Sequence, residues 1–291
     1  MHYVIQENVF RERHYDKLEE SLQRLGLTYD VVRCFPYVDK VTLLSDVPDT
    51  KDAYDIEDLP DYNPGRKDIF CFGAIKLARI AKDLGWKPGS MMNDNHDYMV
   101  YKDHWKEHLL NYDSKICKLG DDFDWKGDIK FIRPTEDTKS FTGQCFTQIE
   151  WEEKKENYLH NYRSDKFNED TLVQVSTPKN ISKEIRFWVV GGKVITGSTY
   201  RDAGIFNIHG QVFPEEYEFA QSMVNIFQLN DAFVIDICVT DCEYKIVEAG
   251  CINCAGFYNA DLLKAIIAIE DHFGTQRVDS NSVIDYPPRE S

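Results

Sequence analysis

The sequence lacks long apolar runs, an excess of basic residues and a phosphate-binding G-x-x-x-x-G-K-[ST] loop. No stretch of about 18 apolar residues is present, so we expect no membrane-spanning helix. The first ten residues carry no basic segment ahead of an apolar run, so we expect no secretory signal. Lysine and arginine number 34 against 50 aspartate and glutamate, a formal net charge of −16. This charge argues against duplex nucleic acid as a partner, and the missing loop excludes the common P-loop nucleotidases.

A disulfide framework is also absent, because the eight cysteines are scattered along 291 residues. Scattered cysteines without a leader are typical of a reducing compartment, so the sequence predicts a soluble, cytoplasmic protein. Hydrophobic residues make up 42% and aromatic residues 13%, enough for a substantial core. The acidic balance remains compatible with a local cationic pocket for a small anion. A homodimer is the default expectation for assembly.

The first third of the chain alternates between strand and helix patterns, whereas the remainder is mainly strands. The early pattern predicts a small open sheet. We predict an α+β fold with a small α/β domain at residues 1–112, a second domain at 113–275 and a polar tail at 276–291. The expected early strands are 2–5, 29–33 and 69–72, and the expected helices are 11–25, 74–84 and 99–110. The expected later strands are 128–134, 172–175, 184–190, 194–200, 233–239 and 245–249, with helices at 215–227 and 261–273.

Gly191-Gly192 predicts a tight hairpin turn between two of these strands. If Val190 pairs with Lys193, strand alternation puts Arg186 on the face opposite a core face. Taken alone, Arg186 fits an ordinary surface arginine paired with Glu184.

The next hairpin, with a turn centred near Cys242, is more informative. Its register places Asp236 directly opposite Glu248, and like charges in that position destabilise a sheet unless a cation is supplied. Two carboxylates and the nearby amide oxygen of Asn253 form a set suited to Mg²⁺. We expect the opposite, apolar face to bring Val247 into the core. A different register would leave both acids solvated.

A further cationic segment follows the strand that ends at Arg133-Pro134. The loop at 135–144 is polar and contains Lys139 and Gly143. Such a loop can fold over phosphate groups with its backbone N–H groups and a lysine.

Several of these motifs stand together in a recognisable order along the chain. They are Arg133-Pro134, the Lys139–Gly143 loop, Leu172-Val-Gln-Val175, Glu184-Ile-Arg186, Gly197-Ser-Thr-Tyr-Arg201, Val-Ile-Asp236 and Glu248-Ala-Gly-Cys-Ile-Asn253. From about residue 115 to 273, the chain resembles an ATP-grasp domain, most closely the compact clade known from bacteria and their viruses. The first hundred residues look like the pre-ATP-grasp sheet domain that usually precedes it.

The resemblance implies a ligase that uses ATP and Mg²⁺ to join a carboxylate and an amine, either small molecules or peptides, through an acyl-phosphate. Cations would neutralise the phosphates while acids hold the metal. The implied nucleotide-binding positions are Arg133, Lys139, Arg186, the backbone near Gln174 and Val175 for the adenine edge, and Glu184 for the ribose or another polar edge. The implied catalytic positions are Arg186 at the phosphates and Arg201 at the acyl-phosphate, and the metal positions are Asp236, Glu248 and Asn253.

Other interpretations remain open. Relatives often have Glu-x-Asn in the last motif, but Gly250 replaces that asparagine here, which permits a domain that binds nucleotide or protein without catalysis. His104 and His108 fit the H-x-x-E-H pattern of a zinc peptidase. A spacing similar to a zinc ribbon is formed by Cys238, Cys242, Cys251 and Cys254.

Overall fold

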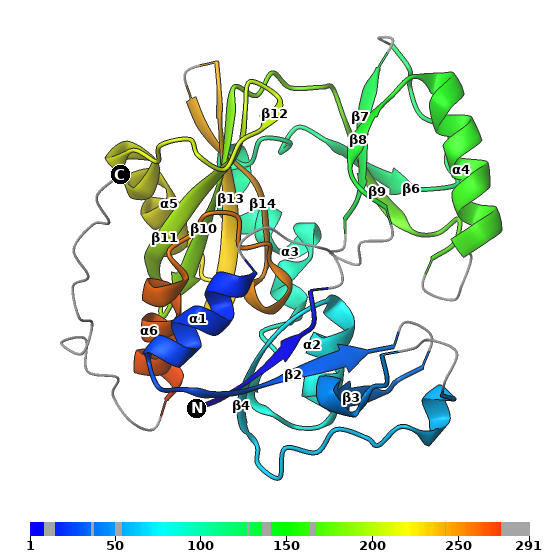
Figure 1. Cartoon of the computed structure of the whole chain (residues 1–291). Helices are drawn as coiled ribbons and strands as arrows, with labels where there is room; N and C mark the ends of the chain where they lie inside the picture. The colour runs from blue at the N-terminus through cyan, green and yellow to red at the C-terminus, as the bar shows by residue number, and fades with distance from the viewer. Residues whose placement is uncertain are drawn as a thin grey trace.

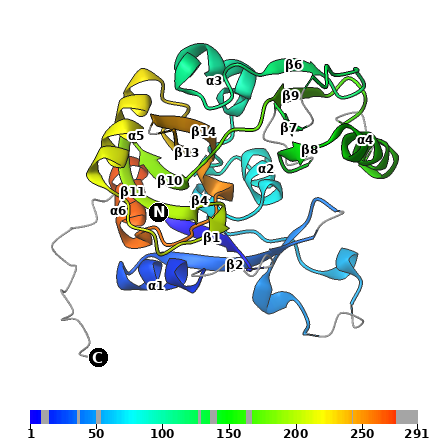
Figure 2. The ribbon, with the colours of Figure 1, turned by 90° about the horizontal axis from the view of Figure 1, so that it is seen from above.

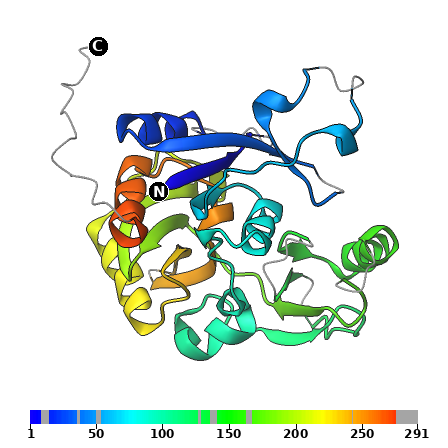
Figure 3. The same ribbon diagram turned by 90° about the horizontal axis from the view of Figure 1, so that it is seen from below.

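Three β-sheets organise the chain, which we call the N-terminal sheet, the small sheet and the large sheet (Figure 1). Figures 2 and 3 show the small sheet and its helix on the opposite side of the molecule from helices α5 and α6. Within the described residues, no helix combines the length and apolar character needed to cross a bilayer. The computed structural model describes residues 1–8, 15–35, 38–49, 54–126, 129–135, 141–162, 167–241 and 243–274.

The N-terminal sheet has the strand–helix–strand organisation predicted for the start of the chain. All five residues of its central strand β1 (His2–Gln6) are buried, because helices cover both faces. One face packs against α1 (Asp16–Arg24) and the other against α2 (Ile75–Asp83). The strand order is β3-β2-β1-β4-β5, with β2 (Thr28–Cys34), β4 (Asp68–Phe72) and β5 (Lys87–Gly89) parallel to their neighbours and β3 (Val41–Leu43) antiparallel.

The large sheet is antiparallel throughout and follows the order β12-β11-β10-β13-β14. Val190 pairs with Lys193 across Gly191-Gly192, as predicted, and both glycines have positive φ. The paired strands are β10 (Lys183–Val190), β11 (Lys193–Asp202), β12 (Ile205–Phe206), β13 (Ala232–Thr240) and β14 (Glu243–Cys251).

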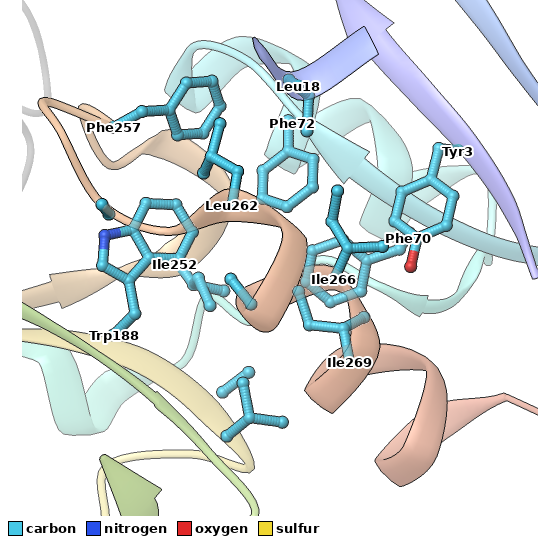
Figure 4. Packing of buried hydrophobic residues seen from close by; sticks show 14 of the residues in the cluster. Tyr3, Leu18, Phe70, Phe72, Trp188, Ile252, Phe257, Leu262, Ile266 and Ile269 are labelled. Atoms are coloured by element: carbon cyan, nitrogen blue, oxygen red, sulfur yellow. The ribbon is translucent and has the colours of Figure 1, made fainter. Parts of the chain in front are cut away.

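Helices cover both faces of the large sheet. The predicted core residues Ile185, Phe187 and Val189 pack with α3 (Tyr98–Trp105) and α5 (Pro214–Ile226). On the other face, α6 (Leu262–Phe273) lies between the large sheet and the N-terminal sheet. Trp188, Phe72, Phe257 and Ile266 therefore share one apolar core, which joins the two sheets (Figure 4).

Helix α3 is shorter than the predicted helix at 99–110. Lys106 has a φ of 46°, which ends the helix before a 3₁₀ turn. The helix packs against the large sheet through Tyr98, Tyr101 and Trp105, so its core contacts group it with that sheet. The domain boundary at residue 112 stays a prediction. The described 3₁₀ turns are η1 (Leu44–Asp46), η2 (Ile56–Asp58), η3 (Asp94–His96), η4 (Lys106–His108) and η5 (Ile252–Cys254).

The small sheet has a hydrophobic core of its own. Trp151 of α4 (Gln148–Tyr162) packs against Ile132 and Val173 of the sheet. This core is separate from those of the large sheet, so the small sheet and α4 form a distinct lobe (Figure 1). The antiparallel order is β6-β9-β7-β8, comprising β6 (Lys115–Lys118), β9 (Leu172–Ser176), β7 (Lys130–Pro134) and β8 (Gln144–Phe146).

Candidate functional site

A cavity of about 710 Å³ lies between the small and large sheets, and we call it the central cavity. Its volume is within the range typical of pockets for small molecules and cofactors. The small-sheet side includes Arg133 and the segment 141–145. The large sheet and the segments attached to it contribute Glu184, Arg186, Tyr200, Arg201, Asp236, Val247, Glu248 and Tyr258, and the connecting segment contributes Pro178, Lys179 and Ile181.

Strand alternation and the position of α6 explain why polar residues gather here. Glu184, Arg186, Trp188 and Val190 alternate along β10 and therefore share one face. Trp188 and Val190 are covered by α6 and the N-terminal sheet, whereas Glu184 and Arg186 line the central cavity. The same face thus supplies core at one end and a binding surface at the other.

Two carboxylates stand opposite one another on this surface, as the sequence predicted. Asp236 of β13 pairs directly with Glu248 of β14. The register then shifts, because Ile237 opposes Ile246 and leaves Val247 as an extra residue. This β-bulge redirects Val247, which lines the central cavity, so its predicted place in the core is wrong.

Arginines supply the positive charge that this acidic pair requires. Arg186 donates Nε and Nη2 hydrogen bonds to the two oxygens of Asp236, each at 2.8 Å. Burial opposes the positive charge of Arg186, but the Asp236 carboxylate outweighs it and raises the arginine pKa above its ordinary value. Arg133 reaches across from the small sheet, with its Nη2 2.9 Å from Glu248 Oε2. The acids and cations therefore come from both lobes.

A second acid–cation pair lies beside the first. Glu184 is buried, and its Oε1 accepts a hydrogen bond from Arg201 Nη1 at 2.9 Å. Its Oε2 accepts from the Tyr200 hydroxyl at 2.8 Å. Burial and the nearby carboxylates raise the pKa of Tyr200, so its hydroxyl stays protonated and acts as a donor. The predicted residues Glu184 and Arg201 thus lie together in the cavity.

The sequence interpretation missed two tyrosines at this site. Tyr200 and Tyr258 stack with ring centroids 5.0 Å apart, and the guanidinium of Arg186 lies 5.9 Å and 5.1 Å from their respective centroids. Tyr200 is four residues from Thr196 on β11, so alternation could have placed it on the same face. Tyr258 follows the strand in a loop, where no periodic pattern applies.

The predicted adenine contacts at Gln174 and Val175 need correction. Both residues pair with β6 on one side and with β7 on the other, so their backbone groups belong to the interior of the small sheet. The cavity is instead lined by the segment just after this strand, through Pro178, Lys179 and Ile181. The prediction therefore selected the correct strand and missed its exit.

The predicted metal ligand Asn253 is also corrected by the structure. Its Nδ2 donates to the carbonyls of Cys71 at 2.7 Å and Gly89 at 3.0 Å. Its Oδ1 accepts from the Met91 N–H at 2.7 Å. These buried hydrogen bonds connect it to the N-terminal sheet, and it does not line the central cavity. Lys139 and Cys242 lie outside the described residues.

The chemistry of the remaining donors fits Mg²⁺ better than zinc. Mg²⁺ is commonly held by one or two carboxylates together with substrate phosphates, which the Asp236–Glu248 pair could satisfy. Among the residues the structure describes, no three His, Cys, Asp or Glu side chains are grouped to hold a metal by themselves. The peptidase interpretation fails because α3 ends before His108, and His104 stacks on Phe227.

Comparison with known proteins assigns the fold. A family described as an ATP-grasp domain, the third family of its clade, matches residues 47–269. No curated protein matches the chain. The solved structures that resemble it include D-cycloserine synthetase DcsG, with 11% identity, a TM-score of 0.57, and coverage of 93% of this chain and 99% of that one.

Two further solved structures agree. D-alanine–D-alanine ligase from Bacillus anthracis in complex with ATP has 14% identity, a TM-score of 0.53, and 94% coverage of both chains. A RimK domain ATP-grasp protein from Sphaerobacter thermophilus DSM 20745 has 12% identity, a TM-score of 0.55, and covers 91% of this chain and 98% of that one. At these identities the similarity establishes the fold alone, and it confirms the predicted ATP-grasp fold with mixed α+β content. Because the family match spans well over half of the sequence, the chain belongs to this ATP-grasp domain family.

Proposed function

We propose that the chain is an ATP- and Mg²⁺-dependent ligase that joins a carboxylate to an amine through an acyl-phosphate. The observation that carries this proposal is the central cavity, where Arg133, Arg186 and Arg201 are each paired with a carboxylate. Transfer of a phosphoryl group depends mainly on positioning and on neutralising charge, and three arginines from facing lobes suit that task.

The proposed nucleotide site uses both lobes. Arg133 and Arg186 would contact the phosphates, since both side chains enter the cavity beside the carboxylate pair. The segment 178–181 would lie along the base. Asp236 and Glu248 would hold Mg²⁺, which supplies charge neutralisation at the phosphates when bound. Arg201 is half-exposed at the cavity and would hold the carboxylate substrate or its acyl-phosphate.

Binding requires an exchange of partners. The carboxylates that now neutralise the arginines would face the nucleotide phosphates unless a metal ion engaged them. Nucleotide and metal should therefore bind cooperatively, with ATP binding roughly ten times or more weakly in EDTA than with Mg²⁺. Equal affinity with and without Mg²⁺ would contradict this exchange.

Calorimetric titration of Mg-ATP tests the site directly. We expect saturable binding by the unmodified protein and none by a folded Arg133→Ala/Arg186→Ala variant. Arg66→Ala is a matched control, because Arg66 also pairs with a neighbouring carboxylate, Asp68, but does so on the exposed surface outside the cavity. Once binding is established, carboxylates and amines should be screened together for release of phosphate.

A second candidate function is a nucleotide-binding or protein-interaction module without catalysis. Gly250 in place of the usual asparagine, together with the engagement of Asn253 elsewhere, favours it by leaving the metal pair without an amide ligand. Mg-ATP binding without phosphate release across a broad screen of substrates would support this alternative.

The substrates, assembly and location follow from the same proposal. We propose small-molecule or peptide substrates, a cytoplasmic location and a homodimer. Sedimentation analysis of the purified chain tests the dimer, and a mass equal to one chain at micromolar concentration would contradict it.

A further inference from the structure

Tyr258 has an unusual backbone conformation beside the central cavity. Its φ is 50°, in the left-handed region that bulky side chains rarely adopt. Among the described residues, the other non-glycine positions with positive φ are Lys106, Ala203 and Asp241, and none of these lines the cavity. A costly conformation at a binding site persists where the surrounding structure imposes it and often serves that site.

The neighbours of Tyr258 impose this conformation. Phe257 is buried in the apolar core, with its ring 5.6 Å from that of Trp188 and 5.7 Å from that of Phe72. On the other side, the Asn259 N–H donates to Ser198 Oγ at 3.0 Å. Figure 4 shows Phe257 beside Trp188 in this core. Both flanking residues are thus anchored, and the tyrosine ring between them is directed to the cavity.

The ring then meets Arg186. The guanidinium lies 5.1 Å from the centroid of Tyr258 and 5.9 Å from that of Tyr200, whose ring is stacked on Tyr258 at an interplanar angle of 16°. An arginine over an aromatic face gains cation–π attraction, which strengthens when the pair is shielded from water. Arg186 is largely buried here, with 13% of its side chain exposed.

We infer that Tyr258 is a positioning residue that holds Arg186 in place during the exchange of carboxylate for phosphate. This inference rests on the proposed nucleotide site. In the structure Asp236 fixes the guanidinium through two hydrogen bonds, but the proposed metal would engage that same carboxylate. The aromatic face does not take part in the exchange, so it keeps Arg186 directed at the phosphates. The face of the ring, and not its hydroxyl, performs this task.

Three substitutions at one position separate this role from a structural one. Tyr258→Phe keeps the ring, Tyr258→Leu removes it, and Tyr258→Gly removes it while relieving the left-handed backbone. Phe206→Leu is the matched control, because the Phe206 ring contacts Tyr258 at 6.2 Å, is exposed, and does not line the cavity.

The experiment is calorimetric titration of Mg-ATP into each variant, with thermal unfolding measured in parallel. We expect the dissociation constant to rise about tenfold in Tyr258→Leu and Tyr258→Gly, and to stay within about twofold in Tyr258→Phe and the control. Tyr258→Gly should unfold at the same temperature as Tyr258→Leu or higher, so its weaker binding would not follow from lost stability.

Each other outcome is decisive. Unmodified protein that binds Mg-ATP, with Tyr258→Leu and Tyr258→Gly binding equally well, would overturn the positioning role and leave the proposed function intact. A loss in Tyr258→Phe as large as in Tyr258→Leu would assign the effect to the hydroxyl and also overturn it. Unmodified protein that does not bind Mg-ATP would overturn the proposed function and the inference together.

Discussion

One face of the large sheet has two ends with opposite characters. At one end Trp188 and Val190 belong to the apolar core under α6, and at the other Glu184 and Arg186 line the central cavity. All four residues alternate along the same strand, with the same neighbours β11 and β13. The strand pattern is therefore the same at both ends, and what lies over the sheet differs.

This difference shows how the fold and the site depend on each other. The apolar end attaches the large sheet to the N-terminal sheet, which leaves the polar end open toward the small sheet. A buried hydrophobic side chain is stabilised by its removal from water, whereas a buried ion pair must offset a large desolvation cost. We therefore expect the apolar end to determine stability and the polar end to determine binding.

The largest effect is expected at the apolar end. Trp188→Ala should lower the free energy of unfolding by about 3–5 kcal/mol, because it removes a fully buried ring and leaves a cavity. Denaturant unfolding measures this change. Trp188→Phe is the control and should cost much less, since the indole N–H has no hydrogen-bond partner among the described residues. A small change in Trp188→Ala would show that the apolar end does not determine stability.

The polar end should respond in the opposite way. Arg186→Met/Asp236→Leu replaces a buried ion pair with apolar side chains, which is often neutral or stabilising. We expect unfolding stability within about 2 kcal/mol of the unmodified protein, and Mg-ATP affinity lower by roughly 100-fold. Single Arg186→Met should be less stable than the double variant, because it leaves Asp236 buried and unpaired. If the double variant were instead the less stable of the two, the division between the ends would fail.

Local sequence patterns could predict much of this face. Gly191-Gly192 marked the turn of one hairpin, and the opposed charges of Asp236 and Glu248 marked the register of the next. Alternation then placed Arg186 on the cavity face. These inferences succeeded because residues near one another in sequence determine them.

The remaining features depend on contacts between distant parts of the chain. The amide of Asn253 binds the carbonyl of Cys71, 182 positions away, so proximity to Glu248 in sequence suggested the wrong partner. The bulge at Val247 shifts a register that composition alone describes as regular. Tyr258 is directed to Arg186 by anchors in a core that forms only when the sheets pack together.

Asn253 offers a test of intermediate size. Asn253→Ala removes hydrogen bonds to Cys71, Gly89 and Met91, and should lower the free energy of unfolding by about 2–3 kcal/mol because buried partners are left unsatisfied. Mg²⁺-dependent nucleotide affinity should change by less than about twofold, well under the roughly 1.4 kcal/mol that equals a factor of ten. Normal stability combined with weaker Mg²⁺ dependence would restore Asn253 as a metal ligand.

The smallest effect on stability is expected at Arg201, where the two ends can be separated most finely. Its side chain is 52% exposed, so its pair with Glu184 should contribute less than about 1 kcal/mol to folding. Glu184 keeps its hydrogen bond from Tyr200 after Arg201→Gln, which limits the cost of losing the arginine. If Arg201 holds the carboxylate substrate, Arg201→Gln should leave Mg-ATP affinity nearly unchanged and raise the KM for that substrate once it is identified. A parallel loss of Mg-ATP affinity would instead place Arg201 at the nucleotide, together with Arg133 and Arg186.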